Sequence, residues 1–558
     1  MKTNSEPRHH YTDVLEHLKT YFPSPVSDPI MDGYFVHSIS RFLDQVDNLK
    51  SAMPLLATGS NEQHYEDSQQ ATFPEQTRSI EEMTAMIASY CQGMMIWSHP
   101  NAQVNVIPPP TISSITAFIA AAMYNPNIIT DDYSARFAEA EIRAVAMLSD
   151  LVGYDSQQSG GLFTFGGTGT IMYGCKLGIE KALHGQGMQE GVREDLKIFS
   201  SNVSHYSRLN VAAWLGVGTK NMIAITSTAN NEMSLSALED ALRATLDKGE
   251  KVAAIIATLG TTDAFGLDDL AAIVQLRDQL VSEYQLDYSP HVHADAVIGW
   301  AWAVFRDYDF QDNPLGFHAR TLRSLMDSLE RIDGLHKADS IGIDFHKTGY
   351  APYISSVFLL KNRNDFALLS RVPEQMPYLY QIGHYHPGIY TLECSRAGSS
   401  ALAALASMQL LGKQGYRVLI GHTIEMAEML RERLERHECI RVLNDYNYGP
   451  VTLFRVYPPE VDADEAFHRE LNDPSYSEQL SAHNDYNRKL FDVIHARVMQ
   501  GEGVMLSWTI GYRHANYANA PAIAAMKSFI MSPWTNLSAV SLVVEQVMDA
   551  RNQLSSRC

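Results

Sequence analysis

The fold of this chain is decided by the stretch Ala338-Asp-Ser-Ile-Gly-Ile-Asp-Phe-His-Lys-Thr-Gly-Tyr350. Residues 340–345 read as a buried strand, because a short apolar run is followed by Gly349 and Pro352, which interrupt regular structure. Lys347 therefore stands just beyond the end of a predicted strand. A lone lysine in such a place is normally solvated, so a chemical role for it needs support from elsewhere in the chain.

A second apolar strand, His291-Val-His-Ala-Asp-Ala-Val297, carries an acid near its end. Asp295 precedes Lys347 by 52 residues, which leaves room for a crossover connection in a parallel sheet. A buried carboxylate and a nearby lysine are the groups that a pyridoxal 5′-phosphate (PLP) enzyme needs. The lysine holds the cofactor aldehyde as a Schiff base, and the carboxylate keeps the pyridine nitrogen protonated.

The same strand also allows a metal site as an alternative, because period-two geometry places His291, His293 and Asp295 on one face. No second cluster of ligands with typical spacing occurs in the sequence. Hydrogen bonds to partner side chains would explain the same alternation. We therefore expect no metal site.

Together the two motifs resemble the paired cofactor motifs of the group II PLP-dependent amino-acid decarboxylases, most of all the bacterial tyrosine decarboxylases. The resemblance covers roughly residues 95–420. It implies fold type I, the aspartate-aminotransferase-like fold, in a homodimer whose active site is shared between subunits. The alternation of predicted strands and helices over about residues 130–390 independently predicts an α/β domain with a mainly parallel sheet.

A glycine-rich loop, Gly160 to Thr170, leads into a predicted helix and favours anion binding, because glycines permit close approach and helix-start amides attract anions. It is no P-loop, since no lysine follows, and the dinucleotide fingerprint fails at Met172. The family seats the PLP phosphate on the corresponding Gly-Gly-Thr. After it, Gly169-Thr-Ile replaces the Glu-Ala-Asn that is common in the family.

Carried over residue by residue, the resemblance implies a set of eight cofactor-binding residues: Gly167, Thr168, His205, Thr262, Asp295, Val297, His346 and Lys347. Within this set, His205 is expected to stack on the cofactor ring and Thr262 to lie near the ring substituents. Asp295 is expected at the pyridine nitrogen, with Val297 packed under the ring.

The segment Arg371–Tyr390 is rich in prolines and aromatic residues and has neither helical nor strand periodicity, so by itself it predicts a surface loop. In the family, a mobile loop at about this distance beyond the lysine carries a tyrosine that protonates the product. The resemblance assigns this role to Tyr378, with Tyr380 in reserve. The expected catalytic residues are therefore Lys347, His205 and Tyr378.

Composition limits the partners. The 558 residues are 45% hydrophobic and 19% charged, with a net charge of -21, which argues against nucleic acid and anionic membranes as partners.

Five cysteines are few, odd in number and unpatterned, which predicts a reducing cytoplasm. The first residues do not resemble a signal peptide, and no run of 18 apolar residues occurs, so we expect neither export nor an anchor.

Three domains are expected. Residues 1–110 form an N-terminal helical segment that contributes to the dimer interface, residues 111–395 the large PLP-binding domain, and residues 396–558 a small C-terminal domain.

The resemblance predicts decarboxylation of an L-amino acid, with an aromatic, tyrosine-like substrate. Alternatives are glutamate or another acidic or aliphatic substrate, a PLP-dependent aldehyde synthase or lyase, or a protein that keeps the fold without turnover. A phenylalanine in place of the loop tyrosine would have favoured an aldehyde synthase. Gln103 stands where tyrosine decarboxylases carry a histidine, so the substrate stays open.

Overall fold

The computed structural model describes residues 11–50, 55–58, 65–192, 195–377, 382–445 and 449–556. The chain divides into two compact units, residues 1–99 with 499–501, and residues 100–498 with 502–558. The bounds of the three domains expected from the sequence stay predictions. Within the described ranges, no helix combines the length and the apolar character that crossing a membrane requires.

The first unit is helical in its described part. Its helices are α1 Tyr11–Lys19, α2 Pro29–Asn48, α3 Tyr65–Ser68 and α4 Ile80–Ser89. Helix α2 begins at a Pro that follows the N-cap Asp28, whose side chain accepts hydrogen bonds from two backbone amides. Helix α4 begins with a capping box formed by Ser79 and Glu82. The two helices pack against each other, yet α2 contains no buried residue.

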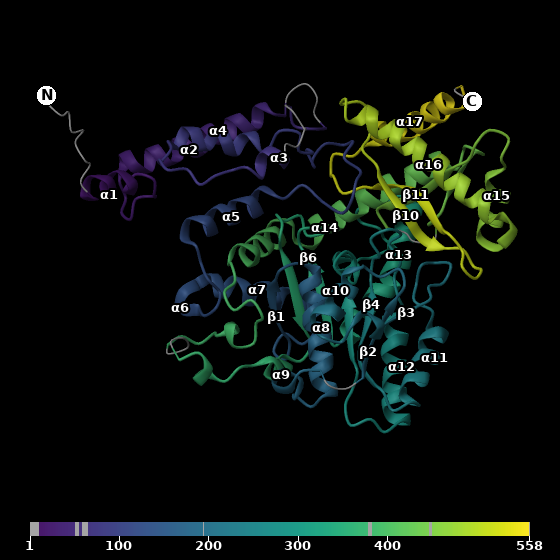
Figure 1. The fold of residues 1–558 in the computed structure, drawn as a ribbon, viewed down its shortest axis with the longest axis horizontal. Helices are drawn as coiled ribbons and strands as arrows, with labels where there is room; N and C mark the ends of the chain where they lie inside the picture. The colour runs from purple at the N-terminus through teal and green to yellow at the C-terminus, as the bar shows by residue number, and fades with distance from the viewer. Residues whose placement is uncertain are drawn as a thin grey trace. The chain divides into compact units, whose positions relative to one another are not determined.

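The second unit is built on a seven-stranded sheet in the order β1-β7-β6-β5-β4-β2-β3. Figure 1 labels β1, β6, β4, β2 and β3 of this sheet. Its strands are β1 Gly160–Thr164, β2 Leu196–Ser201, β3 Met222–Ile225, β4 Lys251–Thr258, β5 His291–Asp295, β6 Ser340–Asp344 and β7 Ser356–Leu360. Strands β6, β5, β4, β2 and β3 run parallel, whereas β7 is antiparallel to both β6 and β1. The predicted α/β fold with a mainly parallel sheet is confirmed.

Helices cover both faces of this sheet. The α-helices around it are α5 Ile112–Tyr124, α6 Asp131–Ser134, α7 Arg136–Val152, α8 Gly167–Ala182, α9 Gly187–Glu190, α10 Ser207–Trp214, α11 Leu235–Leu246, α12 Leu270–Glu283, α13 Ala319–Ile332 and α14 Ser399–Leu434. Short 3-10 helices are η1 Thr219–Asn221, η2 Gly299–Phe305, η3 Asp333–Lys337, η4 Arg363–Leu369, η5 Pro373–Gln375, η6 Pro387–Ile389 and η7 Pro474–Tyr476. Helix α8 packs across β4, β5, β6 and β7.

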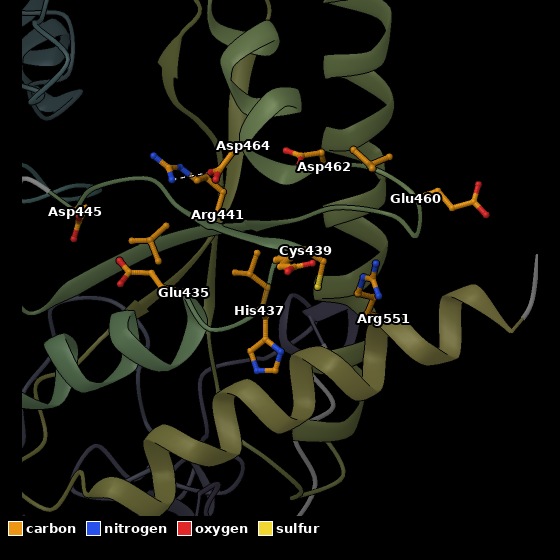
Figure 2. Close-up of a pocket in the computed structure, with 13 residues that line it drawn as sticks. Glu435, His437, Cys439, Arg441, Asp445, Glu460, Asp462, Asp464 and Arg551 are labelled. Carbon is orange, nitrogen blue, oxygen red and sulfur yellow. Dashed lines mark hydrogen bonds and ion pairs between the residues drawn. The ribbon is translucent and has the colours of Figure 1, made fainter.

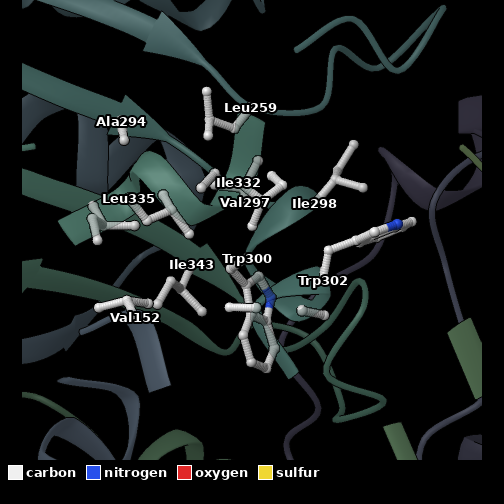
Figure 3. Packing of buried hydrophobic residues seen from close by; sticks show 14 of the residues in the cluster. Val152, Leu259, Ala294, Val297, Ile298, Trp300, Trp302, Ile332, Leu335 and Ile343 are labelled. Atoms are coloured by element: carbon white, nitrogen blue, oxygen red, sulfur yellow. The ribbon is translucent and has the colours of Figure 1, made fainter. Parts of the chain in front are cut away.

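The strand residues alternate between two apolar layers. Ile198 and Ile256 pack with α8 and α10, whereas their neighbours Phe199 and Ile255 belong to the cluster that includes α7 and α11. Both layers are buried, as in parallel sheets covered by helices. Figure 3 shows part of the larger cluster, in which Trp300 lies among aliphatic residues such as Val297 and Ile343.

A second, four-stranded sheet lies in the C-terminal part of this unit, in the order β10-β11-β9-β8 with antiparallel neighbours. Its strands are β8 Ile440–Val442, β9 Val451–Val456, β10 Ser507–His514 and β11 Ala522–Phe529. The accompanying helices are α15 Ala463–Asn472, α16 Ser477–Val498 and α17 Leu537–Ser555.

Candidate active site

The sheet register brings the predicted site residues to one edge. Asp295 at the end of β5 pairs with Thr258 on β4 and with Gly342 on β6, and Lys347 follows β6. Beyond these strand ends lies a cavity of about 190 Å³. Its lining residues are Gly167, Thr168, Ile171, His205, Ser207, Thr258, Gly260, Thr261, Thr262, Asp295, Val297, Asp344, His346, Lys347 and Tyr353. All eight residues expected to bind the cofactor are among them; their roles stay predictions.

Lys347 is largely buried and paired. Its Nζ atom lies 2.9 Å from Oδ2 of Asp344, and 18% of the lysine side chain is exposed. Burial lowers the pKa of Lys347, but Asp344 and, more weakly, Asp295 outweigh it and hold that pKa above its ordinary value. The free lysine is therefore an ammonium ion at neutral pH.

Asp295 presents an unused acceptor to the cavity. Its side chain is buried, and Oδ1 has no hydrogen-bond partner in the described structure. Burial raises the pKa of Asp295 to about 6, although Lys347 acts in the opposite direction. A buried carboxylate oxygen left without a partner is costly, so this atom is suited to a ligand that brings a donor.

His205 is a neutral ring with a defined tautomer. The backbone amide of Ser207 donates to its Nδ1 at 3.2 Å, so Nδ1 is an acceptor and the ring proton sits on Nε2. Burial, and after it the charge of Lys347, lowers the pKa of His205 to about 4. The ring is thus uncharged at neutral pH, as a stacking partner of an aromatic cofactor would be.

The glycine-rich loop brings the start of α8 to the cavity. Gly166, whose φ is 104°, is the N-cap residue of α8. Because it has no side chain, it offers no side-chain acceptor for the hydrogen bonds of the first amides of the helix. A Cβ atom at Gly167 would lie 3.1 Å from Cγ1 of Val297 and 3.2 Å from Oδ2 of Asp344. The open Asp295 oxygen, the buried lysine and this close-packed helix start fit PLP, with its ring nitrogen, aldehyde and phosphate.

Sequence reasoning assigned no role to several residues that line the cavity. Asp344 lies three residues before Lys347 in the stretch that decided the fold, and its place at the end of a buried strand was the available signal. Thr258 and Ser204, whose hydroxyl oxygens are 2.8 Å apart, connect the end of β4 to the loop that carries His205. Tyr353 lies against His346, with ring centroids 4.0 Å apart.

Other predicted residues lie elsewhere. Tyr378 and Tyr380 fall outside the described residues, so the loop tyrosine stays a prediction. Gln103 is buried, accepts a hydrogen bond from Ser528 at 2.7 Å and is not among the residues that line the cavity. His291 and His293 each place a ring nitrogen 2.8 Å from Oγ of Ser340.

The segment that follows the predicted loop is fixed by a buried ion pair. Arg396 contacts both carboxylate oxygens of Glu141, at 2.5 and 2.9 Å. Tyr385 donates its hydroxyl to the same carboxylate at 2.9 Å, and the backbone amide of Phe163 donates at 2.9 Å. The end of the loop is thereby tied to α7 and β1.

A second cavity, of about 750 Å³, lies beside β8 and contains none of the predicted site residues (Figure 2). Its wall is polar and mainly acidic, and Arg441 pairs with Asp464 at 2.9 Å. Across the described ranges, no group of three or more His, Cys, Asp or Glu residues is placed to hold a metal ion.

Comparison with known proteins places the chain in a family. The model described as the pyridoxal-dependent decarboxylase conserved domain matches residues 62–456. An L-2,4-diaminobutyrate decarboxylase of Acinetobacter baumannii is 24% identical over 376 residues, which cover 64% of this chain and 68% of that protein. An L-tyrosine decarboxylase of Enterococcus faecium is 29% identical over 318 residues, which cover 52% of this chain and 47% of that protein.

A solved structure shows the same fold. The Oryza sativa TDC, crystallised with PLP and tryptamine, superposes with a TM-score of 0.73 at 17% identity, covering 95% of this chain and 99% of that chain. The expected type I fold is thereby confirmed.

Because the family model spans more than half of the chain, the protein belongs to the pyridoxal-dependent decarboxylases. The predicted enzyme class, a PLP-dependent amino-acid decarboxylase, and the predicted cofactor are both confirmed.

Proposed function

We propose that this protein decarboxylates an L-amino acid with an aromatic, tyrosine-like side chain to the amine and CO2. The assignment of the site rests on one cavity, which is lined by Lys347, Asp295, His205 and the start of α8. When bound there, PLP supplies an electron sink for the carbon that loses CO2.

The chain's own residues prepare this chemistry. Lys347 would provide the amine that binds the cofactor aldehyde, and the open Oδ1 of Asp295 would accept a hydrogen bond from the protonated ring nitrogen. The neutral ring of His205 would cover the cofactor face, and the amides at the start of α8 would bind its phosphate. The hydroxyl of Tyr378 returns a proton to the α carbon after CO2 leaves. Lys347, Asp295 and His205 are held in place before reaction, so they require little reorganisation.

The charges of the residues that line the cavity favour a substrate with an uncharged side chain. Among the described residues that line the cavity, Lys347 alone carries a permanent positive charge, and Asp344 already pairs with it. A substrate with a second carboxylate would need another cation there. An aromatic side chain needs apolar contacts, which Ile171, Val297 and Tyr353 offer at the cavity wall.

A homodimer is the second part of the proposal, and the exposed surface of α2 supports it. Val36 and Leu43 lie seven residues apart on one side of this helix, with 63% and 54% of their surfaces exposed. Apolar residues in such a stripe call for a covering partner. A second copy of the chain would supply that partner. The few cysteines support action in the cytoplasm.

A lysine substitution tests the assignment of the site. Lys347→Ala is expected to abolish both the visible absorbance of lysine-bound cofactor and amine production. Lys361→Ala, at an exposed lysine beyond β7, is the matched control and is expected to keep both. Bound-cofactor absorbance and turnover that persist in Lys347→Ala would contradict the proposed role.

A further inference from the structure

Two carboxylates face Lys347, and the structure gives them different tasks. Asp344 Oδ2 lies 2.9 Å from Nζ of the lysine. Asp295 also lowers the energy of the charged lysine, yet its Oδ1 stays without a partner. The lysine is thus held by one acid while the other keeps an acceptor open to the cavity.

Asp344 is rigidly placed for this task. Only 1% of its side chain is exposed. Ser356, its antiparallel partner across β6 and β7, donates its hydroxyl to Oδ1 at 2.6 Å. The second oxygen, Oδ2, is thereby aimed at Lys347. Nε2 of His346 is farther from that oxygen, at 3.4 Å.

The neighbouring helix start suits a negative charge at this point. The position of a Cβ on Gly167, the first residue of α8, lies 3.2 Å from Oδ2 of Asp344. The N-terminal end of a helix carries a partial positive charge, which stabilises a carboxylate beside it. Asp344 therefore lies between the lysine ammonium on one side and the start of α8 on the other.

We propose that Asp344 is the positioning residue for Lys347: its carboxylate holds the ammonium group of the lysine whenever that amine is not bonded to the cofactor. In this role Asp344 keeps the lysine away from Asp295, whose oxygen stays available for the cofactor ring. It also keeps the released lysine beside the cavity, ready to displace the product. This inference rests on the proposed function of the same site.

The pH profile of cofactor attachment distinguishes positioning from a structural role. The amine of Lys347 must be neutral to attack the PLP aldehyde, a step that replaces the C=O double bond of the aldehyde by a C=N double bond and releases the oxygen, with both amine protons, as one water. The groups that face this amine are Asp344, Asp295 and Tyr353, with His205 and His346 nearby. Loss of an opposite charge in contact shifts a titration by about one to three pH units.

In the experiment, PLP is added to the apoprotein over a pH series, and attachment is followed by visible absorbance. Borohydride trapping and peptide mass spectrometry then identify the labelled lysine. For Asp344→Asn, and for Asp344→Ser as a second variant, we expect the pH at which attachment reaches half its maximal rate to fall by about one unit or more. Attachment well below the wild-type half-maximum then becomes about tenfold faster, whereas Asp344→Glu stays close to wild type.

The outcomes separate the two claims. Profiles of Asp344→Asn and Asp344→Ser that coincide with wild type overturn the role of Asp344, while labelling of Lys347 leaves the proposed function intact. Failure of wild type to label Lys347 contradicts the proposed function and this inference with it. If neither variant folds, acetylation of Lys347 in wild-type apoprotein over a pH series decides, because the pH midpoint of its reaction is expected above the ordinary value of a lysine side chain, and a midpoint below that value overturns the role.

Discussion

Asp295 stands directly opposite Gly342 in the parallel register of β5 and β6. Lys347 follows Gly342 by five residues, so the acid and the lysine reach the same edge of the sheet. A shift of one residue in this register would turn Asp295 toward the opposite face. The relationship between the two groups is therefore fixed by strand pairing.

Neutralising Asp295 should impair catalysis far more than folding. Asp295→Asn keeps the shape of the side chain but removes the charge that supports a protonated ring nitrogen. Loss of one preorganised electrostatic partner lowers kcat by about 10²–10³-fold. Steady-state kinetics of amine release would measure the change, with cofactor absorbance as a check that PLP still binds. A kcat within a factor of about two of wild type would show that Asp295 has another role.

The acid stability of the apoprotein should depend on His205. Its folded pKa of about 4 lies below the ordinary 6.5, so the unfolded chain binds this proton more tightly. The stabilising contribution is present above about pH 6.5 and is lost as the pH falls toward 4. In His205→Phe, urea unfolding should show a smaller loss of stability between pH 7 and pH 5 than wild type.

Trp214→Phe is the control for that prediction, because Trp214 is an aromatic residue at the end of α10 that is 84% exposed and does not titrate. The loss of stability in this variant should match wild type. An unchanged loss in His205→Phe as well would mean that the ring of His205 titrates normally in the folded apoprotein.

Breaking the buried pair of Glu141 and Arg396 should destabilise the second unit. Glu141→Gln leaves a buried guanidinium without its counter-charge, which costs about 3–5 kcal/mol of unfolding free energy. The double variant Glu141→Leu with Arg396→Met removes both charges and should lose less stability than the sum of the losses of Glu141→Leu and Arg396→Met made singly. Urea unfolding followed by circular dichroism measures these differences, and strictly additive losses would argue against a coupled pair.

Charges on the exposed stripe of α2 should prevent dimer formation. Wild type is expected to sediment at twice the mass of one chain, and Val36→Glu with Leu43→Glu at the mass of one chain. Arg41→Glu is the control, since five residues place it about 140° around the helix from Val36. Sedimentation equilibrium reports the masses. A double variant that remains dimeric would locate the interface elsewhere.

Much of the sheet and of the site was predictable from the sequence. Apolar runs that end at or just before Asp295 and Lys347 predicted the strands, and family motifs predicted the other six of the eight expected cofactor-binding residues that line the cavity. The antiparallel direction of β7 was not predictable, because a buried apolar strand reads the same in either direction. The pairing of Lys347 with Asp344 rather than Asp295 depends on side-chain geometry and on Ser356, which periodicity does not encode.

The most direct measurement is mass spectrometry of the products after the PLP-loaded protein is incubated separately with each common amino acid and with L-2,4-diaminobutyrate. We expect one amine, formed with loss of CO2 from an aromatic amino acid. An amine from an acidic, aliphatic or diamino substrate would correct the substrate. An aldehyde, or no product from any of them, would contradict the proposed decarboxylase activity.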